Sequence, residues 1–452
     1  MKRSNHTMLE GPLLGSIISY TIPVILTSIL QLLFNAADLM IVGRFCGSVS
    51  VAAVGATHSL TSLMVNFFVG LSIGAGVTLA HGLGSRSNTV VHNTVHTALP
   101  ISLICGAILT VIGVCFSGTF LRLMGTPADV LPLSTLYMQI YFGGITFTMI
   151  YNFCAAILRA AGDTRSPLLY LTFAGIINVA LNVVFVTIFH MNVAGVALAT
   201  TISQGISATL VVWALVKRTD ACHLDLKKMR FYPIQLVKIM TIGLPAGLQS
   251  SLFSISNVLI QSSINSFGNV VMSGNAAAYN IEGFVYASLN SFQQTAVNFI
   301  GQNAGAQKYK RVAKIFGICM VLVTITGLIL GALGYAFGPT LLSLYITDSQ
   351  EAIACGMTRL SRVCLLYFIC GMMDVCTGAL RGLGKSLTPM VISILGVCGV
   401  RVGWTLLVFP IPAFHSPQSL YISYPVSWAL TFLLQFIACI LVYRKHTKLL
   451  KT

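Results

Sequence analysis

Long stretches of the chain contain no charged residue, and their lengths are the first guide to its structure. Residues 11–37 form one such stretch, and about 20 apolar residues are enough for a helix to cross a bilayer. The stretches 45–85, 166–216 and 402–443 are too long for one crossing, so each is predicted to fold back at an internal turn. We therefore expect an all-α membrane protein with twelve transmembrane helices, at roughly residues 15–41, 51–79, 95–117, 132–158, 167–188, 194–216, 238–266, 275–300, 312–337, 357–380, 388–410 and 420–443.

The composition supports a membrane protein and excludes a soluble one. Hydrophobic residues make up 56% of the 452 residues and charged residues only 8%, too few to cover a water-soluble surface. The net charge of +16 does not indicate a nucleic-acid partner, because the basic residues sit in short loops. With the N-terminus inside, 21 of the 26 Lys and Arg residues fall on the cytoplasmic side, which predicts that both termini are cytoplasmic.

The second half of the chain repeats the first. NFCAAILRAAGDTRSP at 152–167 and DVCTGALRGLGKSLTP at 374–389 share Cys, Leu, Arg, Gly and Pro at an offset of 222 residues, and Pro23 and Pro245 have the same offset. A duplication of six spans keeps both copies in one orientation, so we expect two six-helix lobes related by a parallel repeat. The expected boundaries are an N-lobe at 1–216, a cytoplasmic linker at 217–238, and a C-lobe with a short basic tail at 239–452.

Nucleotide-driven transport is not supported. GALRGLGKS at 378–386 resembles a phosphate-binding loop, but the first required glycine is Ala379 and the segment follows an apolar helix rather than a strand. The twelve cysteines include no CxxC pair and are read as buried hydrophobes. Two lobes without a nucleotide domain predict alternating access driven by an ion gradient, with no other cofactor.

Three of the ten acidic residues are expected within spans, where a carboxylate is costly and therefore marks a functional site. Asp38 follows Gln31 and Phe34 at helical spacing, and it either carries a proton, binds a cation or makes a structural contact. Asp374 and Glu282 are the other two, and each is expected to meet cationic substrates or to make a polar contact at an interface.

Neutral polar residues near these acids extend the candidate site. Asn178 and Asn182 are four residues apart and share one helix face, and Thr200 lies in the next span. Their oxygens with a carboxylate would suit a hard cation, although hydrogen bonding between helices explains the same spacing. Arg401 is the one basic residue expected deep in a span, and it requires a carboxylate, a substrate anion or access to the interface.

The chain resembles the MATE (multidrug and toxic compound extrusion) family, bacterial type, over nearly its whole length. The residues that carry the resemblance are Pro23, Pro245, AAVGAT at 52–57, LRAAGDTRSP at 158–167 and GALRGLG at 378–384. The resemblance implies a V-shaped fold and drug export driven by inward H⁺ or Na⁺.

The resemblance also assigns roles to individual residues. It implies that Asp38 is the family's first-helix coupling carboxylate, and that Asn178, Asn182 and Thr200 complete a cation site, which would bind metal only if Na⁺ is the coupling ion. Some members have Asp where Asn182 stands here, so the site of this chain carries less charge. Members with a C-lobe cation site carry a Glu in the seventh span, where this chain has no acid, although Asp374 matches their tenth-span Asp.

These observations predict a multidrug antiporter of the bacterial inner membrane that acts as a monomer. Its expected partners are small drugs or organic cations and the lipid bilayer, and we expect the substrate to contact Gln31, Phe34, Asn152, Glu282 and Asp374. The alternative is a flippase for lipid-linked cell-wall or polysaccharide precursors. A flippase would need a basic cavity, and Arg401 alone is expected deep in a span.

Overall fold

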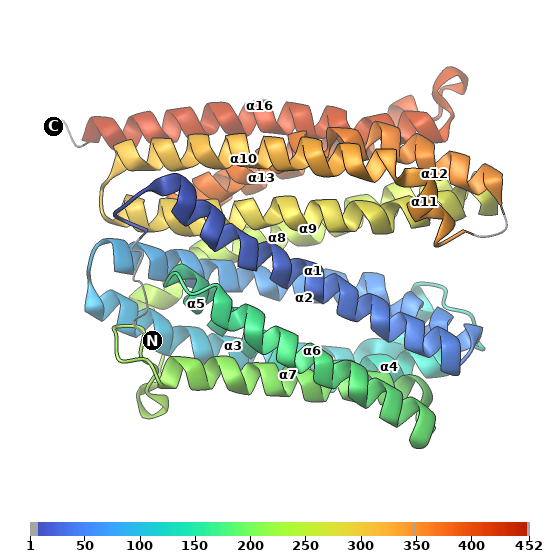
Figure 1. Cartoon of the computed structure of the whole chain (residues 1–452), viewed down its shortest axis with the longest axis horizontal. Coiled ribbons are helices and arrows are strands. Elements are labelled where there is room, and N and C mark those ends of the chain that lie inside the picture. The colour runs from blue at the N-terminus through green and yellow to red at the C-terminus, as the bar shows by residue number, and fades with distance from the viewer. Residues whose placement is uncertain (1–7, 347–348, 450–452) are drawn as a thin grey trace. The chain divides into compact units, whose positions relative to one another are not determined.

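The computed structural model describes residues 8–346 and 349–449, and every element in these ranges is a helix (Figure 1). Lys2, Arg3 and Lys451, which the topology argument counts as cytoplasmic, lie outside the described residues. In the first half of the chain the elements are α1 Leu13–Phe45, α2 Ser48–Gly84, α3 Asn88–Leu123, α4 Leu131–Gly143, α5 Ile145–Ala160, α6 Arg165–Val183, η1 Val184–Ile188, α7 Asn192–Val216 and η2 Leu226–Lys228. In the second half they are α8 Pro233–Asn265, α9 Asn269–Gly305, α10 Tyr309–Ala336, α11 Gly338–Ser343, α12 Gln350–Arg362, η3 Cys364–Leu366, α13 Tyr367–Gly382, α14 Leu387–Ser393, η4 Ile394–Gly399, α15 Val400–Gly403, η5 Trp404–Val408, η6 Pro412–Phe414 and α16 Pro417–Leu449.

The helices account for all twelve expected spans, but not all of them are apolar. Ten helices of the described chain are long and apolar enough to cross a membrane, and α4 with α5, bent by 46°, makes an eleventh. The remaining expected span, 275–300, coincides with α9, which has 37 residues but is too polar to be identified by composition. Six of the twelve Asn, Gln and Ser residues of α9 are buried within the protein, where partners in the protein can satisfy them.

The helices form two compact units, and their boundaries divide two long helices. Unit 1 comprises Met1–Ile25 and Leu248–Thr452, and unit 2 comprises Leu26–Gly247. One boundary between the units lies two residues after Pro23 in α1, and the other lies two residues after Pro245 in α8. The two boundaries are therefore at equivalent positions of the 222-residue repeat. A proline inside a helix removes a backbone hydrogen bond and permits a bend, so each helix can serve two units.

Polar contacts attach the first part of α1 to unit 1. Thr21 and Thr295 of α9 share a hydrogen bond of 2.9 Å, and Asn298 donates to the Tyr20 hydroxyl over 2.8 Å. The Tyr20 ring also meets Phe299 edge-on, with ring centroids 5.3 Å apart. Side chains from the start of the sequence thus complete the polar face of α9.

Glycines attach the first part of α8 to unit 2. A Cβ atom on Gly74 of α2 would overlap the backbone of Ile239 and Gly243, and one on Gly247 would overlap the Phe67 carbonyl. The absence of side chains lets the two backbones touch, as is common between membrane helices. The compact units therefore differ from the expected lobes by two half-helices, because contacts distant in sequence determine where these segments pack.

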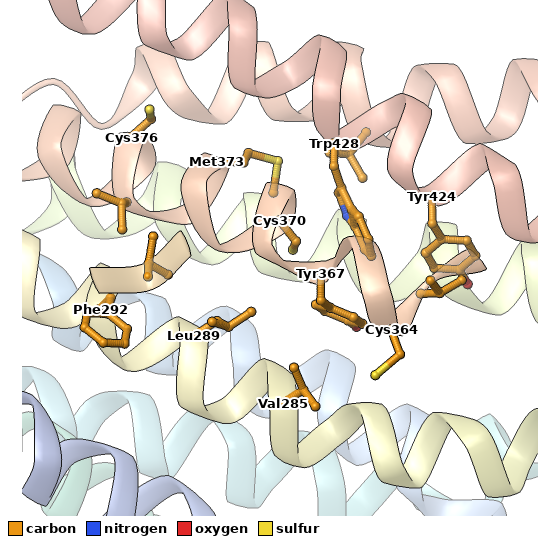
Figure 2. Packing of buried hydrophobic residues seen from close by; sticks show 14 of the residues in the cluster. Val285, Leu289, Phe292, Cys364, Tyr367, Cys370, Met373, Cys376, Tyr424 and Trp428 are labelled. Atoms are coloured by element: carbon orange, nitrogen blue, oxygen red, sulfur yellow. The ribbon is translucent and has the colours of Figure 1, made fainter. Parts of the chain in front are cut away.

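The core of unit 1 is built on α9, α13 and α16, which contribute interlocking buried side chains (Figure 2). Leu289 of α9 and Tyr367 of α13 lie in this core, and the Tyr367 ring centroid is 4.8 Å from that of Trp428 on α16. Large apolar side chains on α10 and α16 also remain exposed, among them Val321 and Leu433. Exposed apolar surface of this extent is expected where lipid replaces water.

The core of unit 2 depends on close contact between α3 and α5. A Cβ atom on Gly106 would lie 2.6 Å from the Cα atom of Thr146, and a backbone atom cannot move aside as a flexible side chain can. We expect Gly106→Ala to lower the stability of the folded protein by about 1–3 kcal/mol, measured as a lower thermal midpoint in detergent. The matched control is Gly317→Ala in α10, where a Cβ meets nothing within 4 Å. Equal midpoints for the two variants would contradict this account of the contact.

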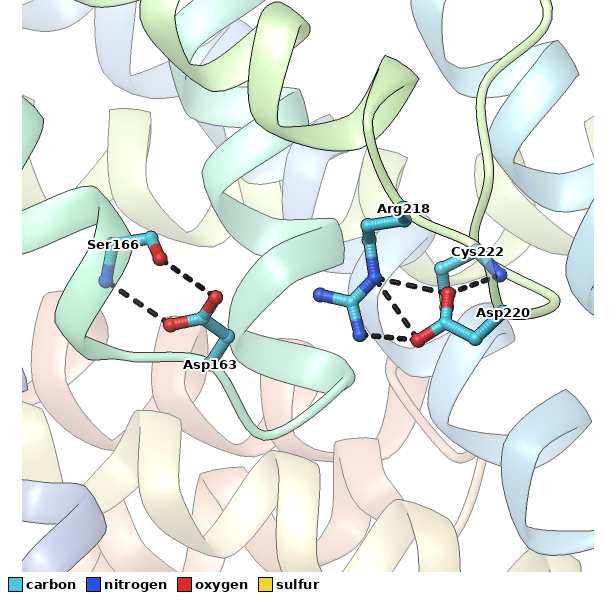
Figure 3. A network of polar contacts seen from close by, with 5 residues as sticks. All are labelled: Asp163, Ser166, Arg218, Asp220 and Cys222. Atoms are coloured by element: carbon cyan, nitrogen blue, oxygen red, sulfur yellow. Dashed lines mark hydrogen bonds and ion pairs between the residues drawn. The ribbon is translucent and has the colours of Figure 1, made fainter. Parts of the chain in front are cut away.

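The expected linker is ordered by its own acidic and basic residues (Figure 3). Arg218 donates to Asp220 from Nε over 2.9 Å and from Nη2 over 2.5 Å, and Asp220 accepts the Cys222 backbone N–H. Burial raises the pKa of the Cys222 thiol to about 12, so this cysteine stays protonated and unreactive. On the neighbouring α5–α6 loop, Asp163 accepts the backbone N–H and the hydroxyl of Ser166 and so secures the start of α6.

Candidate functional site

The structure brings Asp38 together with the three neutral polar residues that the sequence singled out. Asn182 donates from Nδ2 to Asp38 Oδ1 over 2.5 Å, and Thr200 donates from Oγ1 to Asp38 Oδ2 over 3.3 Å. Asn182 also donates to Asn178 Oδ1 over 3.2 Å, and Asn178 donates to Thr200 Oγ1 over 3.3 Å. The four side chains, from α1, α6 and α7 of unit 2, close a ring of hydrogen bonds, which we call the Asp38 ring.

The Asp38 ring contains one acid and no base. Among the described residues, no Lys, Arg or His nitrogen lies within ion-pair distance of the Asp38 carboxylate, whereas neutral donors contact both of its oxygens. Asn182 is fully buried, and its Oδ1 atom has no hydrogen-bond partner in the described part of the chain. A carboxylate with neutral donors and an unused amide oxygen can take up a proton or a small cation without first breaking an ion pair.

Local sequence explains how these side chains reach one another. Asn178 and Asn182 lie one turn apart on α6 and face the same way. The Phe34 ring occupies the space that a side chain at Gly175 would fill, so the second part of α1 lies close to α6 and Asp38 comes one turn later. Directly after Asn182 the helix widens into the π-helical turn η1, a feature often found beside functional sites.

Two residues expected to contact substrate are not members of the Asp38 ring. Gln31 is exposed on α1. Asn152 is half-buried on α5 and donates from Nδ2 to the Thr148 carbonyl of its own helix over 2.8 Å. Neither side chain belongs to the hydrogen bonds that close the ring in the described structure.

Glu282 of α9 forms a buried ion pair with Arg359 of α12. Arg359 donates from Nε and Nη2 to the two Glu282 oxygens over 3.0 and 2.7 Å, and from Nη1 to Asn275 over 2.7 Å. Glu282 is 1% exposed and Arg359 2%. The charge of Glu282 is therefore already neutralised by the protein, and a cationic substrate would have to displace an arginine to reach it.

Asp374 lies in a second buried polar cluster of unit 1. It interacts with Asn290 and electrostatically with Arg381, and its Oδ2 atom has no hydrogen-bond partner in the described structure. Arg381 donates to Gln249 over 2.8 Å, and Gln249 donates to Ser393 over 3.0 Å. This cluster joins α8, α9, α13 and α14 through side chains far apart in sequence.

Arg401 is not the only arginine buried within the described chain. Arg359 and Arg381 are also buried, at 2% and 3% exposure. One helical segment, Gln350–Gly382, carries both: Arg359 lies within the expected span 357–380 and Arg381 directly follows its end. By their positions in the sequence, Arg359 counts toward the outer side and Arg381 toward the cytoplasmic side, because they lie near the two ends of the expected span 357–380.

Within residues 8–346 and 349–449, no three His, Cys, Asp or Glu side chains are grouped so as to hold a metal ion. The Asp38 ring therefore offers a single carboxylate with neutral oxygens to any cation.

The comparisons with known proteins all indicate the same family. A family model described as MatE matches residues 23–184 and 245–406, which are the two halves of the repeat. A probable multidrug resistance protein of Bacillus subtilis is 28% identical over 424 residues, covering 92% of this chain and 91% of the relative. A protein of Shewanella oneidensis named as an FAD transporter is 23% identical and covers 97% of this chain and 96% of its own. A crystal structure of a MATE protein in the bent conformation covers 100% of both chains with a TM-score of 0.91 at 19% identity, a likeness of fold.

Proposed function

Since the chain belongs to the MatE family of membrane transporters, we propose that it exports cationic or amphipathic drugs in exchange for inward H⁺ or Na⁺. It is a multi-pass membrane transporter and not an enzyme. We place it in the bacterial inner membrane with both termini cytoplasmic, following the distribution of Lys and Arg. The relatives named for multidrug resistance and for FAD transport support organic molecules as the substrate class.

The observation that carries the proposal is the Asp38 ring. As a carboxylate, Asp38 accepts hydrogen bonds from Asn182 and Thr200. When it takes up a proton, one oxygen becomes a donor, and the unpartnered Oδ1 of Asn182 becomes the natural acceptor if the amide turns. Turning the amide breaks its bond to Asn178, so a single proton rearranges the contacts between α1, α6 and α7.

Na⁺ is the alternative coupling ion for the same four residues. Asp38, Asn178, Asn182 and Thr200 all present oxygens, which hard cations prefer. One carboxylate makes this a weakly charged site, so the proton is the better match. Either ion couples to export when it and the drug favour opposite-facing states of the transporter.

Ethidium transport in proteoliposomes tests the coupling. The purified protein is reconstituted, and a pH gradient or a Na⁺ gradient is imposed separately while ethidium fluorescence is followed. We expect the pH gradient alone to drive ethidium movement at a rate well above that of protein-free liposomes. A strict Na⁺ requirement would make the ring a cation site, and movement under neither gradient would contradict ion-coupled export.

The flippase alternative is less well supported by the arrangement of charges. A cavity for a lipid pyrophosphate needs several basic groups, whereas Glu282 neutralises Arg359 and Asp374 interacts electrostatically with Arg381. Deleting the gene separates the two functions. Lost cell-wall or polysaccharide synthesis with unchanged drug susceptibility would favour the flippase, and increased drug susceptibility alone would favour export.

A further inference from the structure

Unit 1 buries an unequal number of positive and negative charges. The buried charged side chains of the described chain all lie in this unit, and they comprise two acids and three arginines: Glu282, Asp374, Arg359, Arg381 and Arg401. Glu282 pairs with Arg359, and Asp374 is the acid that interacts with Arg381. Arg401 is left without an acid, although it is only 4% exposed.

The partners of Arg401 are neutral. Its Nε donates to Ser427 over 3.1 Å and its Nη1 donates to Asn257 over 2.9 Å. The guanidinium lies 4.2 Å from the Tyr424 ring centroid and 5.7 Å from that of Trp428, two of the side chains drawn in Figure 2. No acceptor in the described structure contacts the Nη2 group.

Arg359 offers a comparison, because each nitrogen of its guanidinium group donates a hydrogen bond and the group is paired with a carboxylate. The two guanidinium groups lie on the same ring, since Arg359 is 5.3 Å from the Tyr424 centroid. Arg359, however, has a bidentate carboxylate and an amide, which occupy Nε, Nη1 and Nη2. Arg401 has hydroxyl and amide partners at two nitrogens only, and a buried charge without a counter-charge is costly.

The backbone around Arg401 adds an independent indication of a site. Arg401 lies on the short α-helical segment α15, between the π-helical segments η4 and η5. π-Helical turns are rare and are frequent at functional sites. In the first repeat, the π-helical segment η1 directly follows Asn182 of the Asp38 ring, at nearly the position that η5 has in the second repeat. Each unit therefore has a π-helical turn beside a buried polar group.

We propose that Arg401 binds an oxyanion, a carboxylate carried by the transported molecule, so that the protein accepts zwitterionic or anionic aromatic substrates as well as cations. The proposal rests on the export function proposed above and names part of its substrate class. Nη2 would donate to the substrate carboxylate, and Asn257 and Ser427 hold the guanidinium in place from the other side. Carboxylate and guanidinium suit one another in geometry as well as charge.

A pair of dyes that differ only at the carboxylate tests this site. Rhodamine B has a free carboxylate, and its ethyl ester has the same ring system without it. Binding of each dye to the purified protein in phosphatidylcholine nanodiscs is measured by fluorescence anisotropy, without any ion gradient. We expect Arg401→Gln to weaken rhodamine B binding about ten- to a hundredfold and to change ester binding less than about threefold.

Controls separate a binding role from a folding role. Arg122→Gln removes an exposed arginine and should leave both affinities unchanged. Arg401→Lys keeps the charge and should fold, with rhodamine B binding between those of the wild type and Arg401→Gln. If Arg401→Gln does not fold, benzoate competition in the wild type replaces it, and benzoate should displace rhodamine B but not the ester.

Several results would overturn the proposal. These are failure of the wild type to bind rhodamine B, equal or tighter binding of the ester, and equal weakening of both dyes by Arg401→Gln. Loss of rhodamine B binding in nanodiscs of anionic phosphatidylglycerol would assign Arg401 to a lipid headgroup instead. Because no gradient is used, these outcomes are independent of whether ethidium export is ion-coupled.

Discussion

Asp38→Asn is expected to reduce gradient-driven ethidium export to the rate of protein-free liposomes, while the protein remains folded in the membrane. The substitution keeps the size of the side chain and its place beside Asn182 and Thr200. It removes the one group of the Asp38 ring that can carry a negative charge, which both a proton and Na⁺ require. Export rate in proteoliposomes, with equal amounts of reconstituted protein, is the measurement.

Two controls make this result specific to coupling. Asp129→Asn makes the same chemical change at an exposed loop acid and should export at the wild-type rate. Ethidium binding by Asp38→Asn, measured without a gradient, should be retained, because the carboxylate is proposed to carry the ion and not the drug. Export by Asp38→Asn at the wild-type rate would contradict the proposed role of Asp38.

Glu282→Gln is expected to cause the largest loss of stability among single changes in unit 1. Arg359 would remain buried against Asn275 and Tyr424 with its charge no longer balanced. Breaking one partner of a buried pair costs about 3–5 kcal/mol, whereas replacing both with apolar residues is often neutral. We therefore expect a much lower thermal midpoint in detergent for Glu282→Gln.

The double variant Glu282→Leu with Arg359→Met distinguishes a structural pair from a substrate contact. It should recover most of the lost stability, because no buried charge remains. Ethidium export by the double variant should also persist if the pair serves structure alone. An unchanged midpoint in Glu282→Gln, or a double variant no more stable than the single one, would refute the structural role of the pair.

The candidate site could be predicted from the sequence only where its signals were local. Asp38 stood out because a carboxylate inside an apolar span is rare, and the four-residue spacing placed Asn178 and Asn182 on one face. That these groups meet in one ring is a fact of helix packing, which needed Gly175 to admit Phe34. The pairing of Glu282 with Arg359 joins residues 77 positions apart, and no spacing rule predicts such a contact.

The sequence by itself determined the membrane class, the all-helical architecture, the duplication and the isolated acids, because hydrophobicity, charge and repetition are properties of the chain alone. Only the tertiary structure decided which unit each half of α1 and α8 joins, why the polar α9 is tolerated, and which buried arginine lacks an acid. The physical reason is that burial and pairing are set by neighbours distant in sequence. Thr21 meets Thr295, and Arg401 meets Asn257, only after the helices have packed.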